Sequence, residues 1–179
     1  MTEGTSVIRT ALLTLASGGV TYLIVEAWSG GGGGSAGVGV YGGSGGGAGG
    51  YARVLIPANA GPFSASVGYP GKMTTGGTGE DGQATRFVSA NQFISLTITG
   101  GRGGGVAAGG LGGDLEVSPG TLLLQSSRGG NGASGAFFGS SGSGGASPFG
   151  SMFASGGAGC PSGATSTAGS PGLMLITYH

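Results

Sequence analysis

The sequence predicts an all-β protein: a small, jelly-roll-like β-sandwich base that carries glycine-rich insertions. Short apolar runs with strand-like alternation are the first reason. The second is glycine, which supplies 49 of the 179 residues and gathers in tracts between those runs. The third is that no stretch sustains a helical period without an interrupting glycine. Net charge is zero and 37% of the residues are apolar. This is the reverse of the disorder signature, so we expect one ordered domain over residues 1–179.

The strands are predicted from two-residue periodicity. In residues 63–69 (FSASVGY) apolar residues alternate with serine and glycine, and in residues 93–99 (FISLTIT) they alternate with serine and threonine. Residues 22–28 (YLIVEAW) and 51–56 (YARVLI) are apolar on both faces, as expected of central strands. Further strands are expected at residues 121–124 and 173–178.

The start of the chain, MTEGTSVIRTALLTLASGG, superficially suggests a signal peptide. Its apolar stretch, residues 11–16, is short and follows both a glutamate and an arginine, so a first strand is favoured. No apolar run approaches the roughly 20 residues that cross a bilayer, and we expect no membrane insertion. The lone Cys160 cannot form an internal disulfide, which fits folding in a reducing cytoplasm.

The charged residues are few and scattered. Six basic and six acidic residues balance each other, and the cations stand singly along the chain. Because phosphate binding needs clustered lysine and arginine, we expect no nucleic-acid partner.

Glycine-rich insertions separate the expected strands at residues 30–50, 71–82, 100–113 and 129–172. They keep no Gly-X-Y register, so a collagen helix is not expected. The extended backbone with three residues per turn has no internal hydrogen bonds, and its N–H and C=O groups must bond to neighbours. Rods without side chains can approach closely enough to form these bonds. We therefore expect bundled polyglycine II rods, with larger residues such as Tyr41 facing outward or marking turns.

Two glycine motifs suggest ligands but lack the context that those ligands need. Residues 37–42 (GVGVYG) fit the dinucleotide-binding pattern, yet no helix can begin in the glycine run that follows. Residues 76–81 and 109–114 match the opening G-G-x-G-x-D of calcium-binding β-roll repeats. These copies are far apart, and Gln83 and Glu116 stand where the repeat needs a large apolar residue. A glycine turn with a solvated aspartate is favoured, and a calcium-dependent surface module remains an alternative.

The sequence contains no catalytic constellation. Its only histidine, His179, is the last residue, so a Ser-His or Cys-His pair would need the chain terminus. Cys160 has no neighbouring cation in the sequence to activate it. Glu80 and Asp81 lie on a glycine-rich loop that would hold them poorly as an acid–base pair. We predict a protein that is not an enzyme and has no cofactor, metal or catalytic residues.

Bulky residues that interrupt the glycine tracts are the candidate contact residues. Aromatic side chains at loop tips commonly anchor a partner or a sugar. The phenylalanines can instead plug gaps between rods, which is the favoured interpretation, and both interpretations also apply to Tyr41 and to the Lys72-Met73 turn. The candidate receptor-contact residues are Tyr41, Lys72, Met73, Phe137, Phe138, Phe149 and Phe153.

The order of these segments resembles a known family. An apolar strand that ends at an aromatic and runs into glycine (YLIVEAWSGGGGG) precedes a tyrosine-initiated strand with proline and a Val-Gly turn (GGYARVLIPANAGPFSASVGYPG). The segments FISLTITGGRGGG, GASPFG and the terminal GSPGLMLITY follow. Over residues 18–179 this order is similar to the glycine-rich domains of bacteriophage tail fibre and other virion proteins. The resemblance implies a β-sandwich that carries polyglycine II rods.

This resemblance also implies a non-enzymatic virion structural protein, assembled in the host cytoplasm and exposed at the tail or capsid surface. Its implied partners are other virion proteins and a host cell-surface receptor, which the chain would contact during adsorption. The long N-terminal shaft of tail fibres is missing, so a separate tip or decoration subunit, or a small structural component of the particle, is expected. Because a core limited to the strands is small for this length, self-association into a homo-oligomer is expected as well.

A second alternative comes from a different class. Bundled polyglycine rods occur in the receptor-binding adhesins of T-even-like phages and also in snow-flea antifreeze protein. An ice-binding polyglycine protein would need a flat, regular face of small residues, whereas bulky Phe and Tyr interrupt the tracts here. The virion protein is therefore favoured over the ice-binding protein.

Overall fold

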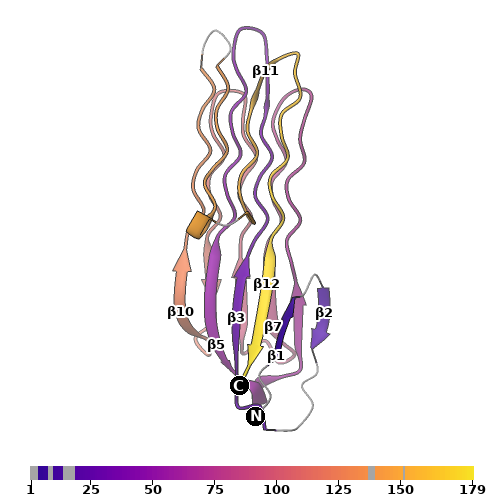
Figure 1. The fold of residues 1–179 in the computed structure, drawn as a ribbon, viewed down its shortest axis with the longest axis vertical. Coiled ribbons are helices and arrows are strands. Elements are labelled where there is room, and N and C mark those ends of the chain that lie inside the picture. Colours follow the sequence, from indigo (N-terminus) through magenta and orange to yellow (C-terminus); the bar gives the residue numbers. More distant parts are fainter. Residues whose placement is uncertain (1–3, 8–9, 14–18, 137–139, 151) are drawn as a thin grey trace.

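A computed structural model describes residues 4–7, 10–13, 19–136, 140–150 and 152–179. The all-β class is confirmed, because the regular structure in these residues consists of strands and two single-turn 3-10 helices, η1 (Ala58–Ala60) and η2 (Pro148–Gly150). The strands form a base at one end of an elongated molecule, and the glycine-rich segments extend from it to the other end (Figure 1).

Two five-stranded antiparallel sheets make up the base. The first has the order β1 (Gly4–Val7), β12 (Leu173–Tyr178), β3 (Tyr22–Trp28), β5 (Tyr51–Pro57) and β10 (Leu122–Ser127). The second has the order β2 (Thr10–Leu13), β6 (Phe63–Ser66), β7 (Thr85–Ser89), β8 (Ser95–Ile98) and β9 (Leu115–Val117). A short parallel pair, β4 (Ala36–Gly37) with β11 (Cys160–Ser162), lies near the far end of the glycine segments (Figure 1).

The core of the base lies between the two sheets. Alternate residues of each strand point inward, as the two-residue period requires, and they join in one buried cluster. Phe63 and Phe87 of the second sheet stack with ring centroids 4.9 Å apart. The largest fully buried side chains of the cluster are Leu23, Val25, Val54, Ile56, Met174 and Ile176 from the first sheet and Phe63, Phe87, Ile94, Leu96 and Ile98 from the second sheet and its turn.

Some predicted strand boundaries were wrong. The strand expected at residues 63–69 ends at Ser66, because the chain there enters a glycine segment and Gly68 donates its N–H to the Thr85 hydroxyl (2.9 Å). The strand expected at residues 93–99 begins only at Ser95, because Phe93 belongs to a turn in which its N–H bonds to the Asn91 side chain (3.1 Å).

The strand expected near the start of the chain corresponds in part to β2 (Thr10–Leu13), and residues 14–18 lie outside the described residues. The strand expected at residues 121–124 extends to Ser127. The strands that were not predicted are β1, β4, β7, β9 and β11. Of these, β7 and β9 each follow a glycine-rich segment, and β4 and β11 lie within segments that were interpreted as insertions.

The glycine-rich segments bond to one another side by side, as expected from the sequence. Successive N–H groups of residues 29–35 point in turn to three neighbouring segments, and every third N–H returns to the same neighbour. This period is that of a backbone with three residues per turn. The acceptors are Gly50, Gly47 and Ser44 for residues 29, 32 and 35, Gln83 and Glu80 for residues 30 and 33, and Ser170 and Thr167 for residues 31 and 34, at N···O distances of 2.8–3.1 Å.

Residues 29–35 and 42–50 form the interior of this bundle, which we call the rod bundle. Nearly all of them are buried. A Cβ atom added to Gly46 would overlap the backbone oxygen of Gly32 and lie 2.6 Å from its carbonyl carbon. A Cβ added to Gly32 would overlap the backbone of Arg102. Only glycine permits this spacing, so the interior of the bundle is made of backbone rather than of side chains.

Two serine hydroxyls bridge backbone N–H and carbonyl groups that do not bond to each other directly. The Ser29 hydroxyl accepts the N–H of Gly50 (2.9 Å) and donates to the carbonyl of Thr99 (2.6 Å). Two turns further along, the Ser35 hydroxyl accepts the N–H of Ser44 (2.7 Å) and donates to the carbonyl of Gly105 (2.7 Å). Each hydroxyl therefore pairs a backbone N–H group of one segment with a backbone carbonyl of another.

Candidate functional site

The turns at the far end of the rod bundle form its most exposed apolar region away from the base. Val38, Val40 and Tyr41 are 50%, 51% and 45% exposed. The turn is tight: Tyr41 donates its N–H to the Val38 carbonyl (3.2 Å), and Gly39 takes a φ of +61°, which glycine adopts without strain. Tyr41 therefore lies at a turn, as predicted, at the end opposite the sheets (Figure 1).

Two further candidates, Lys72 and Met73, were expected at a turn, but they lie on the extended segment that leads to a bend at residues 75–77. Met73 is 58% exposed, and the Lys72 ammonium lies 3.8 Å from the carboxylate of Glu80. Both charged side chains are largely exposed, so their attraction contributes little to stability. The next residue, Thr74, donates its N–H to the Ser166 hydroxyl (2.9 Å). Met73 is thus exposed on a segment that is bonded to a neighbouring segment.

The four phenylalanine candidates do not share one place. Phe137 and Phe138 lie outside the described residues. Phe149 belongs to η2, which lies just above β10 where the rods meet the base (Figure 1). Phe153 packs against Trp28 and its neighbours at the same junction. Phe149 and Phe153 therefore lie far from the turns at the far end, and their role as receptor contacts stays a prediction.

An aromatic cluster surrounds these two residues. The rings of Trp28 and Tyr51 lie 4.7 Å apart, and Phe149, which is 62% exposed with a φ of +58°, meets Tyr51 edge-on at 4.8 Å. The Tyr51 hydroxyl donates to Glu26 (2.7 Å). Burial, then the hydrogen bond and charge of Glu26, raise the pKa of Tyr51, and Arg53 lowers it by less. Tyr51 is therefore a neutral hydrogen-bond donor at the junction. Within the described residues the buried Trp28 indole nitrogen has no hydrogen-bond partner.

An open groove of about 440 Å³ runs along the lower part of the rod bundle. Its charged lining residues are Asp81, Arg102, Asp114 and Arg128. The sequence analysis did not find this groove, although the two calcium-like glycine motifs both contribute their aspartate to it.

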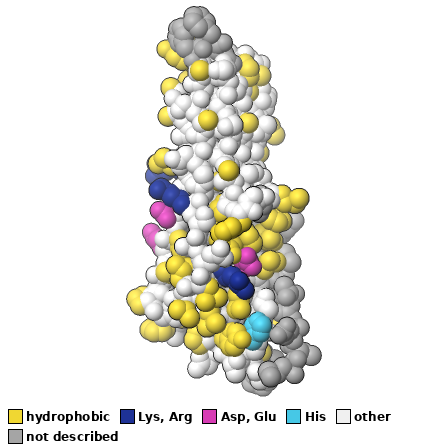
Figure 2. All heavy atoms as spheres, turned by 60° about the vertical axis from the view of Figure 1, so that its left-hand side comes forward, with side chains coloured by type: hydrophobic (Ala, Val, Ile, Leu, Met, Phe, Trp, Pro, Cys, Tyr) yellow, Lys and Arg dark blue, Asp and Glu magenta, His cyan; other side chains and the backbone are white. Residues whose placement is uncertain are grey.

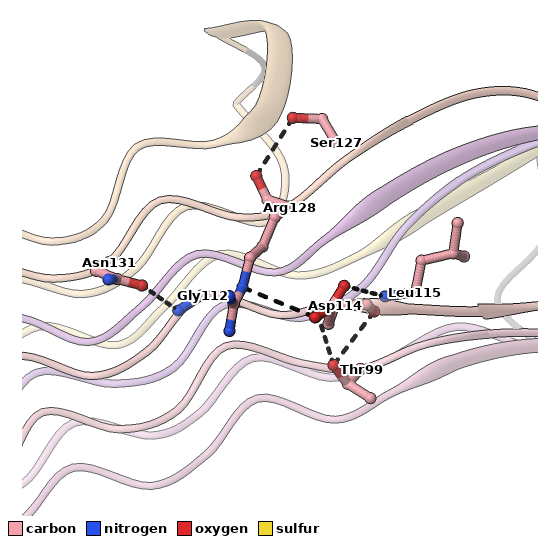
Figure 3. Close-up of polar contacts among 7 residues, drawn as sticks. All are labelled: Thr99, Gly112, Asp114, Leu115, Ser127, Arg128 and Asn131. Carbon is pink, nitrogen blue, oxygen red and sulfur yellow. Dashed lines mark hydrogen bonds and ion pairs between the residues drawn. The ribbon is translucent and has the colours of Figure 1, made fainter.

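The two carboxylates of the groove accept backbone N–H groups, and Figure 3 shows the contacts of one of them, Asp114. Asp114 accepts the N–H of Leu115 (2.9 Å) and lies 3.9 Å from the Arg128 guanidinium, and its own N–H donates to the Thr99 hydroxyl (2.7 Å). Asp81 accepts the N–H of Gly103 (2.7 Å). Both aspartates thus fix the ends of glycine segments, and within the described part of the chain no group of three or more His, Cys, Asp and Glu residues is placed to hold a metal ion.

His179 and Cys160, which the sequence analysis considered for catalysis, each contact another part of the chain. His179 stacks on Tyr22 with ring centroids 4.9 Å apart. Cys160 is buried, and its thiol donates to the carbonyl of Ala164 (2.9 Å). In the described residues no helix is long and apolar enough to cross a membrane.

No protein-family model matches the sequence, and no curated protein matches it. The fold described above and the order of the sequence segments are therefore the basis for assigning a function.

Proposed function

We propose that this chain is a non-enzymatic structural protein of a bacteriophage particle, exposed at the tail or capsid surface, where its far turns contact a host receptor. The observation that carries the proposal is the division of the molecule into a base and a projecting rod bundle. At the base, Gly4 of β1 pairs with Tyr178 of β12, so the first and the last described strands of the chain are both held there (Figure 1). The exposed turns lie at the opposite end.

The rod bundle suits the presentation of these turns. Its interior residues bond to neighbours in three directions, and every added Cβ in its centre would meet backbone. Such close packing resists deformation. Turns on a rigid support bind a partner without a large loss of conformational entropy, so Val40 and Tyr41 are well placed to act as anchors.

Particle composition and adsorption test this proposal. Mass spectrometry of purified particles from the phage that encodes the chain is expected to find it, and deletion of its gene is expected to impair assembly or adsorption. Particles that lack the protein, or a deletion that leaves assembly and adsorption unchanged, would contradict the proposal.

A paired substitution tests the contact surface. The double variant Val40→Ser, Tyr41→Ser removes apolar area at the far turn, and we expect at least a tenfold slower adsorption with normal assembly. Tyr69→Ser is the matched control, because Tyr69 is 66% exposed and lies beside Gln83, where the glycine segments leave the sheets, and adsorption is expected to stay unchanged. Equal adsorption by both variants would assign the contact to another surface.

A further inference from the structure

The open groove of the rod bundle lies along three bonded glycine segments. Residues 99–104 form the middle segment, which bonds on one side to residues 79–82 and on the other to residues 111–114, at N···O distances of 2.8–2.9 Å. All three segments line the groove, whose volume of about 440 Å³ is in the range of small-ligand sites. In Figure 2 basic and acidic side chains lie together on the lower part of the rod bundle, and hydrophobic ones gather over the base below.

The charged side chains of the groove stand at two levels. Asp114 directly precedes β9 and lies 3.9 Å from the Arg128 guanidinium, next to the sheets (Figure 3). Asp81 accepts the N–H of Gly103, so it stands near the level of Arg102, about one three-residue turn further out. At 3.1 Å per residue, this turn separates the two levels by roughly 9 Å. Each level therefore holds one carboxylate and one guanidinium of the groove lining.

Some polar groups of the groove are fixed by the protein, and others are free for a ligand. The carboxylates of Asp81 and Asp114 accept backbone N–H groups at 2.7 and 2.9 Å, and each keeps further lone pairs. Among the described residues the guanidinium of Arg102 has no hydrogen-bond or ion-pair partner. The N–H of Gly100 has no acceptor in this part of the chain either, and it points the same way as that of Gly103, one turn along. The groove thus presents fixed acceptors beside free donors.

This combination of groups selects among ligand classes. The two carboxylates repel an anion, and the two guanidiniums repel a metal ion or another cation. An apolar ligand would find little to contact, because Leu111, which is 47% exposed, is the one large apolar side chain among the described residues that line the groove. A hydroxyl group both donates and accepts a hydrogen bond, so neighbouring hydroxyls on a neutral ligand match acceptors that stand beside donors.

Linked sugar rings have the hydroxyls and the spacing that the groove requires. A sugar ring carries hydroxyls on its rim and C–H groups on its faces, so a ring bonded at the outer level can also pack on Leu111. The roughly 9 Å between the two levels is a distance that two linked rings span. We propose that this groove binds a neutral oligosaccharide through the carboxylates of Asp81 and Asp114 and the guanidinium of Arg102. The groove begins next to the sheets and the far turns lie at the opposite end (Figure 1), so sugar binding does not depend on the proposed receptor contact.

Binding of the fluorescently labelled full chain to an array of immobilised neutral and acidic oligosaccharides tests the proposal. We expect binding to members of the neutral set, with little dependence on salt, because a neutral sugar brings no charge to be screened. Binding to none of the oligosaccharides, or to acidic ones alone, would overturn the proposal.

Matched variants locate the site. Arg102→Ala removes charge-assisted donors and is expected to weaken binding to the strongest neutral member of the array at least about tenfold. Arg53→Ala is the control, because it removes an exposed arginine of β5 that does not line the groove, and binding is expected to stay unchanged. The Val40→Ser, Tyr41→Ser variant should also bind the sugar as the wild type does. Equal affinity of the Arg102 and Arg53 variants would overturn the proposal.

Amide chemical shifts of the wild-type chain give a second measurement, which serves if Arg102→Ala does not fold. On addition of the same oligosaccharide, the amides of Gly100 and Gly112, which line the groove, are expected to shift. The amide of Gly39 at the far turn is expected to stay in place. Shifts at Gly39 without shifts at Gly100 and Gly112 would place the sugar elsewhere and overturn the proposal.

Discussion

The base and the rod bundle exclude water from their interiors in opposite ways. In the base, apolar side chains such as Phe87 and Leu96 fill the space between two sheets. In the rod bundle, backbone packs against backbone, and the interior contains few side chains larger than those of alanine and serine. The base is therefore stabilised mainly by apolar burial, whereas the bundle is stabilised by hydrogen bonds and close contact. Substitutions should consequently have different effects in the two regions: the bundle cannot accept added atoms, and the base cannot lose them.

The largest effect is expected for an added methyl group in the centre of the bundle. Gly46→Ala would force the Cβ into the backbone of Gly32, and we expect the free energy of unfolding to fall by at least about 4 kcal/mol. Denaturant unfolding, followed by fluorescence of the single Trp28, measures this change. The control is Gly76→Ala, at a turn where an added Cβ meets nothing within 4 Å, and its effect is expected to be below about 0.5 kcal/mol. Equal stability of the two variants would contradict the packing described here.

Removal of atoms from the base is expected to have the next largest effect. Leu96→Ala leaves a cavity in a fully buried site, which should lower the free energy of unfolding by about 3 kcal/mol. The same unfolding assay measures it. Met152→Ala, at a residue that is 82% exposed, is the control and should change stability by less than about 0.5 kcal/mol. A small effect at Leu96 would mean that the interior of the base is loosely packed.

Loss of one bridging serine hydroxyl in the bundle is expected to have the third largest effect on the free energy of unfolding. Ser29→Ala leaves the buried N–H of Gly50 and the partly buried carbonyl of Thr99 without their shared partner, and the loss of both bonds should lower stability by about 2 kcal/mol. Ser64→Ala on the exposed side of β6 is the matched control and should have almost no effect. If both serine variants were equally stable, the bridging hydroxyl would not contribute to the bundle.

The smallest effect is expected at the junction between the two regions. The pKa of Tyr51 is raised in the folded chain, so the native state holds this proton more tightly than the unfolded state does. Its contribution to stability is therefore complete below the ordinary tyrosine pKa of about 10 and is lost as the pH rises above that value. Tyr51→Phe should lower stability by about 1 kcal/mol near neutral pH, through loss of the bond to Glu26.

The difference in stability between the wild type and Tyr51→Phe, measured across this pH range, checks the sign. It should shrink as the pH rises above about 10. Tyr22→Phe, at a less buried tyrosine of the same sheet, controls for general alkaline effects. A difference that grows with pH would contradict the assigned direction.

The sequence predicted the parts of the fold that depend on local pattern. Tyr22–Trp28 and Leu173–Tyr178 have the predicted bounds, because unbroken apolar runs leave few alternatives to central strands. The lateral bonding of the glycine segments was also predictable, since a glycine tract without internal hydrogen bonds must find partners elsewhere. The bridging hydroxyls of Ser29 and Ser35 were not predicted, although their spacing of two three-residue turns is a signal that could have indicated them.

The parts that were missed depend on how distant segments come together. Phe149 and Phe153 were expected either between the rods or at loop tips because residues 129–172 looked like one insertion, but the chain returns to the base within it and forms η2 there (Figure 1). The groove that brings Asp81 beside Asp114 depends on which glycine segments are neighbours, and glycine sequences specify this only weakly. A strand was predicted at residues 121–124, where β10 begins at Leu122, but nothing in the pattern indicated an edge strand.

Hydrogen exchange tests most directly the claim that the glycine segments form a bonded interior equal in order to the sheets. The amides of Gly31 and Gly46, which bond to Ser170 and Gly157, are expected to exchange as slowly as that of Val25 in the centre of β3, with opening free energies that approach global unfolding. Gly39, at the exposed turn, should exchange fast. Rapid exchange of Gly31 and Gly46 alongside a protected Val25 would contradict the claim and would mean that the glycine segments are loosely held above a stable base.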